Sequence, residues 1–249
     1  MIATLLIGRR GSRGVPGKNT MPMLGRPLMM YPIMAARHAK QAGRIYLSTD
    51  DPVIARIGAD AGLELIDRPA VLATDQALVE DVVQHGYREI VSRSGPLELL
   101  VLLFCNSATI PPGMIDEGIE RLRADPVLDS AVSVSRYNEY SPVRAMRIGS
   151  EGLLANYVDV SAIPGASCDR DTAEDCWFCD CSVWVLRPRC IDPLSDSLPF
   201  RWTGRAVWPM RQQGGLDIDH PQGIAQTEWW LRGHGFTEDA VPYGKEGQA

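Results

Sequence analysis

The sequence has no long apolar run. No stretch approaches the roughly 18 uninterrupted apolar residues that a membrane-spanning helix needs. The chain begins MIATLLIGRR, where two arginines end a short apolar segment, and no basic region precedes that segment as it would in an export signal. We therefore expect no membrane partner, no export and a cytoplasmic location.

The chain also lacks an excess of positive charge. Lys and Arg total 25 against 31 Asp and Glu, a net charge of −6, whereas general nucleic-acid binders usually present a basic surface, so we expect no nucleic-acid partner. Acidic residues are absent before Asp50, and this N-terminal segment is rich in cations. That concentration indicates either a site for a small polyanion or a solvated basic surface. The cations are Arg9, Arg10, Arg13, Lys18, Arg26, Arg37, Lys40 and Arg44.

Cysteine is too sparse to suggest a disulfide framework. The chain has 6 cysteines, and without an export signal these are expected to be reduced thiols. Cys176, Cys179 and Cys181, with Cys168 upstream, include the C-x-x-C spacing of half a zinc site. From the sequence, structural zinc and ordinary buried thiols both remain open.

Apolar strand patterns alternate with helical patterns along the first half of the chain, which predicts βαβ units. We therefore predict an α/β fold of three layers with a mainly parallel sheet, formed as a single domain over residues 1–249. Ligands bind such sheets at the carboxyl ends of the strands. The predicted strands are 2–7, 44–48, 63–67 and 97–104, and the predicted helices are 27–41, 52–61, 76–92 and 111–123.

The alternation stops between residues 130 and 185. Two short strands are predicted there, at 131–135 and 145–148, followed by a polar stretch over 161–180. We predict that 130–185 is an irregular excursion, either a lid or a dimer arm.

The segment GRRGSRGVPGKN, residues 8–19, is the strongest sign of chemistry. Its glycines let backbone N–H groups converge on phosphate oxygens, and Arg9, Arg13 and Lys18 can offset the charge of a triphosphate. A Walker loop is excluded because Ser12 and Asn19 stand where it needs Gly and Ser or Thr. The glycines are three apart, which also excludes the dinucleotide fingerprint; a purely structural turn is the alternative.

The same segment resembles the N-terminal signature of the acylneuraminate cytidylyltransferase family, the CMP-sialic acid synthetases and relatives acting on other 3-deoxy-2-keto sugar acids. A second block, Ser48 to Asp75, resembles the family nearly throughout, and LDIDHPQGIAQTE resembles its metal-binding motif at Asp217 and Asp219. The three blocks occur in the family's order.

The resemblance implies a Rossmann-like nucleotidyltransferase that transfers CMP from CTP to a small acidic sugar and releases pyrophosphate. It implies Mg²⁺ as the cofactor, held by Asp217 and Asp219, and Arg9, Lys18 and Asp217 as catalytic residues. It further implies a homodimer, because 130–185 resembles the region through which relatives pair. The implied nucleotide-binding residues are Arg9, Gly11, Ser12, Arg13, Lys18, Asn19 and Arg68.

The acidic pair also has a physical rationale. Residues two apart in a strand project to the same face, so both carboxylates can meet one hard cation. On spacing alone, Asp217 and Asp219 can equally mark a solvated turn at the end of a strand. A helix is expected to start at Pro221.

The segment Phe104–Ile110 departs from the family's QPTSPLR-like sugar-binding segment. Only the Ser107 position is kept, and Ile110 replaces the basic residue, a change that could cost a few kcal/mol for a polar sugar. Asn106 and Ser107 remain the candidate substrate-binding residues, and none is carried over from Trp177–Trp184. Two alternatives stay open: another acceptor, such as a phosphonate or a different sugar, and a nucleotide-binding module without catalysis.

Overall fold

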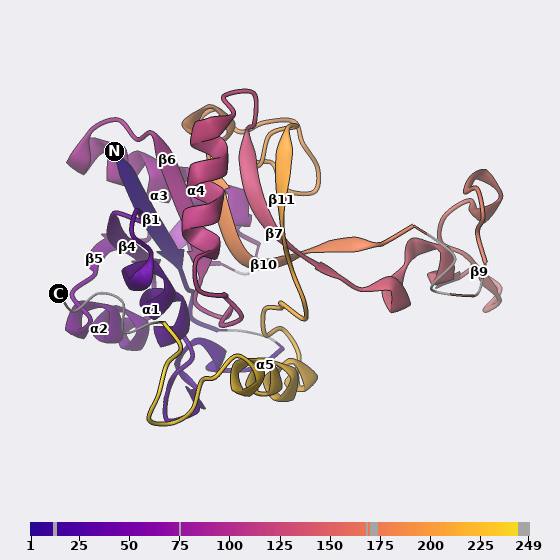
Figure 1. Ribbon diagram of the computed structural model, residues 1–249, viewed down its shortest axis with the longest axis horizontal. Coiled ribbons are helices and arrows are strands. Elements are labelled where there is room, and N and C mark those ends of the chain that lie inside the picture. Colours follow the sequence, from indigo (N-terminus) through magenta and orange to yellow (C-terminus); the bar gives the residue numbers. More distant parts are fainter. Residues whose placement is uncertain (12–13, 75, 168, 170–173, 244–249) are drawn as a thin grey trace.

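The computed structural model describes residues 1–11, 14–74, 76–167, 169 and 174–243. Within these ranges a seven-stranded sheet forms the centre of the molecule, with the strand order β11-β7-β10-β6-β1-β4-β5 (Figure 1). The predicted α/β class is confirmed. Its strands are β1 (Ile2–Ile7), β4 (Arg44–Thr49), β5 (Glu64–Asp67), β6 (Leu99–Phe104), β7 (Ser130–Arg136), β10 (Trp177–Leu186) and β11 (Val207–Gln212).

The sheet is mainly parallel. β1 pairs in parallel with β4 and β6, β4 with β5, and β11 with β7. β10 is the exception, because it runs antiparallel between β6 and β7. All six residues of β1 are buried, as expected for a central strand covered on both faces.

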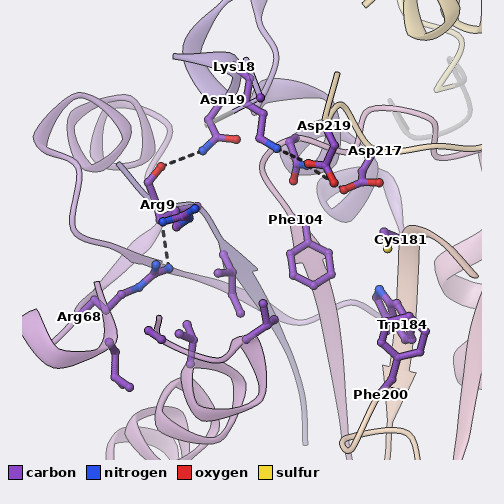
Figure 2. A pocket seen from close by; sticks show the side chains of 18 of the residues that line it. Arg9, Lys18, Asn19, Arg68, Phe104, Cys181, Trp184, Phe200, Asp217 and Asp219 are labelled. Carbon is purple, nitrogen blue, oxygen red and sulfur yellow. Dashed lines mark hydrogen bonds and ion pairs between the residues drawn. The ribbon is translucent and has the colours of Figure 1, made fainter. Parts of the chain in front are cut away.

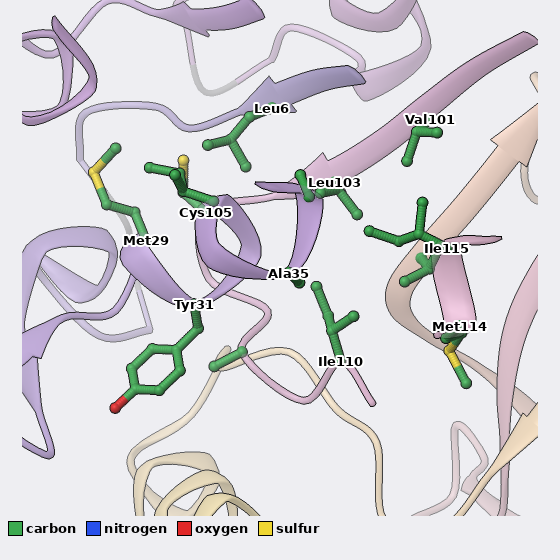
Figure 3. Close-up of a cluster of buried hydrophobic side chains, with 14 of the residues drawn as sticks. Leu6, Met29, Tyr31, Ala35, Val101, Leu103, Cys105, Ile110, Met114 and Ile115 are labelled. Carbon is green, nitrogen blue, oxygen red and sulfur yellow. The ribbon is translucent and has the colours of Figure 1, made fainter. Parts of the chain in front are cut away.

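Two hydrophobic clusters fill the two faces of this sheet. Side chains along β1 alternate between them: Leu6 joins the cluster under α1, α2, α4 and α5, whereas Leu5 joins the cluster under α3. Figure 3 shows the first cluster, which gathers Tyr31 of α1, Ile115 of α4 and Leu103 of β6. The helices are α1 (Met30–His38), α2 (Pro52–Asp60), α3 (Val79–Ser94), α4 (Met114–Ala124) and α5 (Pro221–Gly233).

The predicted excursion over 130–185 is wrong at both ends. β7 and β10 belong to the central sheet, and only the residues between them leave it. The polar stretch predicted over 161–180 reaches into β10, where the buried Asp180 accepts hydrogen bonds from the hydroxyls of Ser133 and Ser135 of β7. Buried hydroxyls with partners are compatible with a core strand.

The segment between β7 and β10 extends away from the body as an arm (Figure 1). It contains the antiparallel pair β8 (Met146–Ile148) and β9 (Leu154–Asn156), which makes no sheet with the body. A second small hairpin, β2 (Pro22–Met23) with β3 (Arg26–Pro27), precedes α1. Across the ranges given above, every helix is too short or too polar to cross a lipid bilayer.

Candidate active site

A cavity of about 550 Å³ opens at the carboxyl ends of β1 and β6. Its walls come from the turn after β1, the segment from Arg68 to Val82, the end of β6, strand β10 and the loop before α5. Figure 2 shows Lys18, Asp217 and Asp219 together at one end, with Arg9 and Arg68 on one side and Cys181, Trp184 and Phe200 on the other. The cavity therefore joins segments from both halves of the chain.

The turn after β1 is fixed from within. The buried Asn19 donates its side-chain Nδ2 to the backbone carbonyl oxygen of Arg9 at 3.2 Å. The backbone carbonyl oxygen of Asn19 accepts the Met29 N–H. The backbone N–H of Gly8 donates to Ser48 at the end of β4. These bonds hold the turn over the sheet edge, so that Arg9 and Lys18 both line the cavity.

Arg68 lies beneath this turn, with a side chain that is 2% exposed. Its Nη2 donates to the carbonyl oxygens of Gly8 at 3.0 Å and Ser48 at 2.6 Å. Burial lowers the pKa of Arg68, an effect that nearby Asp50 partly opposes. The guanidinium therefore anchors two backbone segments of the site, while its predicted direct contact with the nucleotide stays a prediction.

The acidic pair reaches the cavity from the far end of the chain. Lys18 Nζ lies 2.5 Å from Asp219 Oδ1, and Asn106 donates Nδ2 to Asp217 Oδ2 at 3.0 Å. Burial and then the nearby Asp219 charge raise the pKa of Asp217. Both effects make the ionised form of Asp217 less favourable. Additional positive charge nearby would stabilise that ionised form.

The acidic pair was expected in a strand, and this expectation is wrong. Asp217 and Asp219 lie in an extended loop between β11 and α5, and the expected helix does begin at Pro221. The loop is tied to the body: Ile218 N–H donates to Asn106 O at 3.0 Å, and Leu216 N–H donates to Thr109 Oγ1 at 2.9 Å. These contacts replace the ladder hydrogen bonds that a strand would have supplied.

The donor set suits magnesium. Mg²⁺ is usually bound through one or two carboxylates together with substrate phosphates, and the cavity offers two neighbouring carboxylates beside a cationic turn. Within the described ranges, no group of three or more His, Cys, Asp or Glu side chains is arranged for a metal. Cys168, the upstream cysteine of the possible zinc site, falls outside the described residues.

The structure brings together most of the residues predicted for the site. Gly11 instead lies on the outer side of the turn, with a positive φ of 75°, against a small neighbouring pocket. Ser107 is fully buried, its Oγ donates to Ser182 Oγ at 3.5 Å, and it is not among the residues that line the cavity, so its contact with substrate stays a prediction. Ser12 and Arg13 fall outside the described residues. Those that line the cavity are Arg9, Lys18, Asn19, Arg68, Asn106, Asp217 and Asp219.

Several cavity residues were not predicted. The largest group is aromatic, and it comes from β6, from β10 and from the segment between β10 and β11. Trp184 lies in the segment from which the family resemblance carried over no residue. Among the apolar neighbours of Trp184, the sequence does not distinguish a side chain that lines a cavity from one that packs in the core. The unpredicted residues that bear on the chemistry are Phe104, Cys181, Trp184, Phe200, Trp202 and His220.

Comparison with known proteins agrees with this geometry. A family described as cytidylyltransferase has a sequence model that matches residues 3–141. An N-acylneuraminate cytidylyltransferase of Escherichia coli is 27% identical over 142 residues, covering 57% of this chain but only 33% of the relative. A 3-deoxy-manno-octulosonate cytidylyltransferase of Anaeromyxobacter is 27% identical over 195 residues, covering 69% of this chain and 77% of the relative.

Solved structures show the same fold at lower identity. A CMP:2-keto-3-deoxy-manno-octonic acid synthetase complexed with CTP superposes with a TM-score of 0.66 at 14% identity, over 94% of this chain and 99% of the other. A 4-diphosphocytidyl-2C-methyl-D-erythritol synthase superposes with a TM-score of 0.63 at 10% identity, over 92% and 98%. At these identities the likeness concerns the fold alone.

Proposed function

Because the chain belongs to the cytidylyltransferase family, we propose that it transfers CMP from CTP to a 3-deoxy-2-keto sugar acid and releases pyrophosphate. The activities of its relatives support this substrate class: they are cytidylyltransferases of N-acylneuraminate, 3-deoxy-manno-octulosonate and pseudaminic acid. Because Phe104–Ile110 differs from the sugar-binding segment of the family, a phosphonate or another sugar remains the alternative acceptor.

One observation carries the proposal. The cationic turn and the acidic pair, 201 positions apart in the chain, meet in one cavity through Lys18 and Asp219. A triphosphate held by the turn would therefore present its phosphates to the carboxylates. A phosphate site without such a pair would bind a nucleotide but would have no carboxylates to hold a metal cation against the negative charge that develops during transfer.

The chain's own residues would act by positioning and charge. Lys18 and Arg9 would neutralise phosphate oxygens, and Arg68 would hold the turn in shape beneath them. A hydroxyl of the acceptor would attack the α-phosphorus in line, and the bond to pyrophosphate would break. The hydroxyl proton would leave to solvent or to a phosphate oxygen.

Asp217 and Asp219 would hold magnesium, with Asn106 orienting the carboxylate of Asp217. Bound there, magnesium would neutralise phosphate charge and make the attacking hydroxyl more acidic. Before binding, Lys18 supplies part of that positive charge to Asp219.

Pyrophosphate release across a panel of nucleotides and acceptors tests the proposal. We expect turnover with CTP and a sugar acid, and a loss of more than about a hundredfold in kcat for Asp217→Asn. Asp60→Asn, a change at an exposed carboxylate on α2, serves as the control. CTP binding without turnover on any acceptor would instead support a module that has lost catalysis.

We also propose a homodimer formed through the arm. A two-stranded hairpin such as β8 with β9 is marginally stable alone. Its apolar side chains are exposed, among them Ile148, Leu154 and Tyr157. Pairing with a second copy would cover them.

A further inference from the structure

The loop that carries Asp217 and Asp219 is held by a buried side chain from the segment after β6. Thr109 is 0% exposed and is not among the residues that line the cavity. Its Oγ1 donates to the backbone carbonyl oxygen of Leu216 at 2.9 Å and accepts the backbone N–H of Leu216 at 2.9 Å. One hydroxyl therefore bonds both backbone groups of the residue that precedes Asp217, as a residue of a neighbouring antiparallel strand would do.

A second hydroxyl fixes the direction of this one. A threonine hydroxyl has a single proton, and Thr109 donates its proton to Leu216 O. In the contact between Thr109 Oγ1 and Ser182 Oγ at 3.1 Å, the proton therefore comes from Ser182. Ser182 is also fully buried, and its Oγ accepts Nε2 of Gln212 at 3.1 Å. Buried donors thus orient Thr109 toward the acidic loop.

Two further contacts hold the same loop, through the backbone N–H groups of Gly215 and Ile218. Like the contact at Leu216, they come from the body of the protein and lie within two residues of Asp217. The Asp217 side chain lines the cavity, whereas the Asp219 side chain is 63% exposed. The position of Asp217 is therefore set by backbone contacts behind it.

Magnesium tolerates little displacement of its ligands. Mg²⁺ requires near-octahedral geometry with oxygen ligands at about 2.0–2.1 Å. Groups that orient metal ligands from behind typically change metal affinity about 10–100-fold when they are removed. Because Thr109 does not line the cavity, loss of its hydroxyl should affect the metal and leave the acceptor untouched.

We propose that Thr109 is a positioning residue of the magnesium site: its hydroxyl fixes the backbone at Leu216 and thereby places Asp217 within reach of a cation bound to the triphosphate. This inference rests on the proposed cytidylyl transfer. It gives the segment Phe104–Ile110 a role other than that of the family's sugar-binding segment, because here a hydroxyl of that segment serves the acidic loop.

The test is the gain in CTP affinity that Mn²⁺ produces, because Mn²⁺ takes the same oxygen ligands as Mg²⁺. Calorimetric titration with CTP in EDTA and with CTP plus Mn²⁺ measures this gain without turnover. Thr109→Val keeps the side-chain volume and removes the hydroxyl, so it should reduce the gain about tenfold and leave metal-free CTP binding unchanged. Thr109→Ser keeps the hydroxyl and should stay within about threefold of the unaltered protein.

Hydrogen exchange and kinetics give two further readouts. In the protein without nucleotide or metal, the Leu216 amide should exchange about tenfold faster in Thr109→Val, because its hydrogen-bond acceptor is lost. In steady-state kinetics, Thr109→Val should raise the Mg²⁺ concentration for half-maximal turnover about tenfold. The KM for the acceptor should not change.

Thr227→Val is the matched control. Thr227 on α5 is fully buried, and its Oγ1 has no hydrogen-bond partner among the described residues, so the same substitution removes no such contact. Ser130→Ala controls for lost stability, because it removes a buried hydroxyl that donates to Thr203 O at 2.7 Å at the amino end of β7. Neither substitution should alter the effect of Mn²⁺ on CTP affinity.

The outcomes distinguish the two proposals. A folded Thr109→Val in which Mn²⁺ still produces the full gain would overturn the positioning role and leave cytidylyl transfer intact. If Thr109→Val does not fold, Ser182→Ala takes its place, since it removes the donor that orients Thr109 and should reduce the gain about threefold. An unchanged gain in Ser182→Ala would then overturn the positioning role. No turnover with CTP on any acceptor by the unaltered protein would overturn the proposed function itself, and with it this inference.

Discussion

At the scale of single residues, the contact between Lys18 and Asp219 is better explained by function than by stability. Their charged atoms are 2.5 Å apart, but the Asp219 side chain is 63% exposed. Ion pairs in contact with solvent contribute at most about 1 kcal/mol, and salt weakens them further. The pair therefore adds little to folding. Its effect is to keep an ammonium group and a carboxylate at one end of the cavity.

Gly14 allows these groups to approach. A Cβ atom on Gly14 would lie 1.9 Å from the backbone carbonyl oxygen of Asp219, far closer than two such atoms can come. We predict that Gly14→Ala pushes the turn and the acidic loop apart and lowers kcat/KM at least about tenfold, because small displacements of reacting groups cost that much. Steady-state kinetics would measure this.

Thermal unfolding should change little in Gly14→Ala, since Gly14 is exposed. Gly149→Ala on the arm is the control, because its added Cβ would make only an ordinary contact with Leu153 O at 3.6 Å. Full activity in Gly14→Ala would show that the turn and the loop need not be this close.

Residue chemistry decided which parts of the site the sequence could predict. Arg9 and Lys18 were predicted from the cationic, glycine-rich turn, and Asp217 and Asp219 from the family resemblance; the structure brings all four to one cavity. Trp184 was not identified, since an aromatic residue in an apolar strand has the same pattern whether it faces core or ligand. Only the tertiary arrangement shows that its N–H has no partner.

At the scale of elements, an irregular segment of β10 supports the acidic loop. The register of β10 against β7 shifts between Cys179 and Trp184, and Cys181 adopts a positive φ of 60°. Such bulges re-aim side chains. Here the buried Asp180 accepts hydrogen bonds from Ser133, Ser135, the Ser182 N–H and Gln212, while Cys181 lines the cavity.

Asp180 should therefore stabilise both the sheet and the site. Ser135 Oγ, which donates to Asp180, also accepts the backbone N–H of Gly215 at 2.9 Å, just before the acidic pair. We predict that Asp180→Asn lowers the free energy of unfolding by about 2–3 kcal/mol, because its amide group would face hydrogen-bond donors. We expect kcat to fall as well.

Chemical denaturation and steady-state kinetics on Asp180→Asn would check both effects, with Asp60→Asn as the exposed control. A free energy of unfolding within about 0.5 kcal/mol of the unaltered protein would contradict the assigned role, since surface substitutions stay within that range.

Asp129 joins the ends of three sheet strands and should make stability depend on pH. Its carboxylate accepts the N–H groups of Arg205 and Ala206 and the Nε of Arg189, at 2.9, 3.0 and 2.9 Å. Burial raises its pKa, but these hydrogen bonds together bring it below the ordinary value. A lowered pKa in the folded state stabilises the fold above the ordinary pKa, and that stability is lost as the pH falls.

We predict that Asp129→Asn costs about 1–2 kcal/mol at neutral pH and that this difference shrinks as the pH falls below about 4. Urea unfolding at a series of pH values would measure it. Asp60→Asn, at an exposed carboxylate on α2, is the control for the substitution at neutral pH. A gap between Asp129→Asn and the unaltered protein that stays constant down to pH 2 would contradict the linkage.

The elements were predicted best where the chain is uniformly apolar. β1, β4, β6 and the helices between them follow from the alternation of apolar strands and amphipathic helices. β10 and β11 were missed, because their polar and irregular residues resemble loop. β1, β4, β5, β6 and β7 were thus predictable, whereas β10 and β11 were not.

At the scale of the whole molecule, the hairpin of β8 and β9 on the arm forms no sheet with the body among the described residues. Ile148 and Leu154 face each other across β8 and β9, and both are exposed. A protein rarely leaves such side chains open to water on a projecting hairpin. The proposed homodimer would bury them.

Replacing Ile148 and Leu154 together by Asp should dissociate the dimer, because two charges would then enter an apolar contact. Sedimentation velocity at several concentrations would show the change in mass, and thermal unfolding of the body would report on folding. Val127→Asp, at an equally exposed apolar position on the body, is the control. An unaltered protein that sediments as a monomer at every concentration would refute the homodimer.

The contact between Lys18 and Asp219 also determines when the site can form during synthesis on the ribosome. Synthesis proceeds at about 5–20 residues per second, and the N-terminal part emerges first. Its turn after β1 then has no carboxylate partner until the loop before α5 has been translated. A nascent chain halted before residue 217 therefore carries the cationic turn without its acidic partner, and the site is assembled only when the loop before α5 has joined the body.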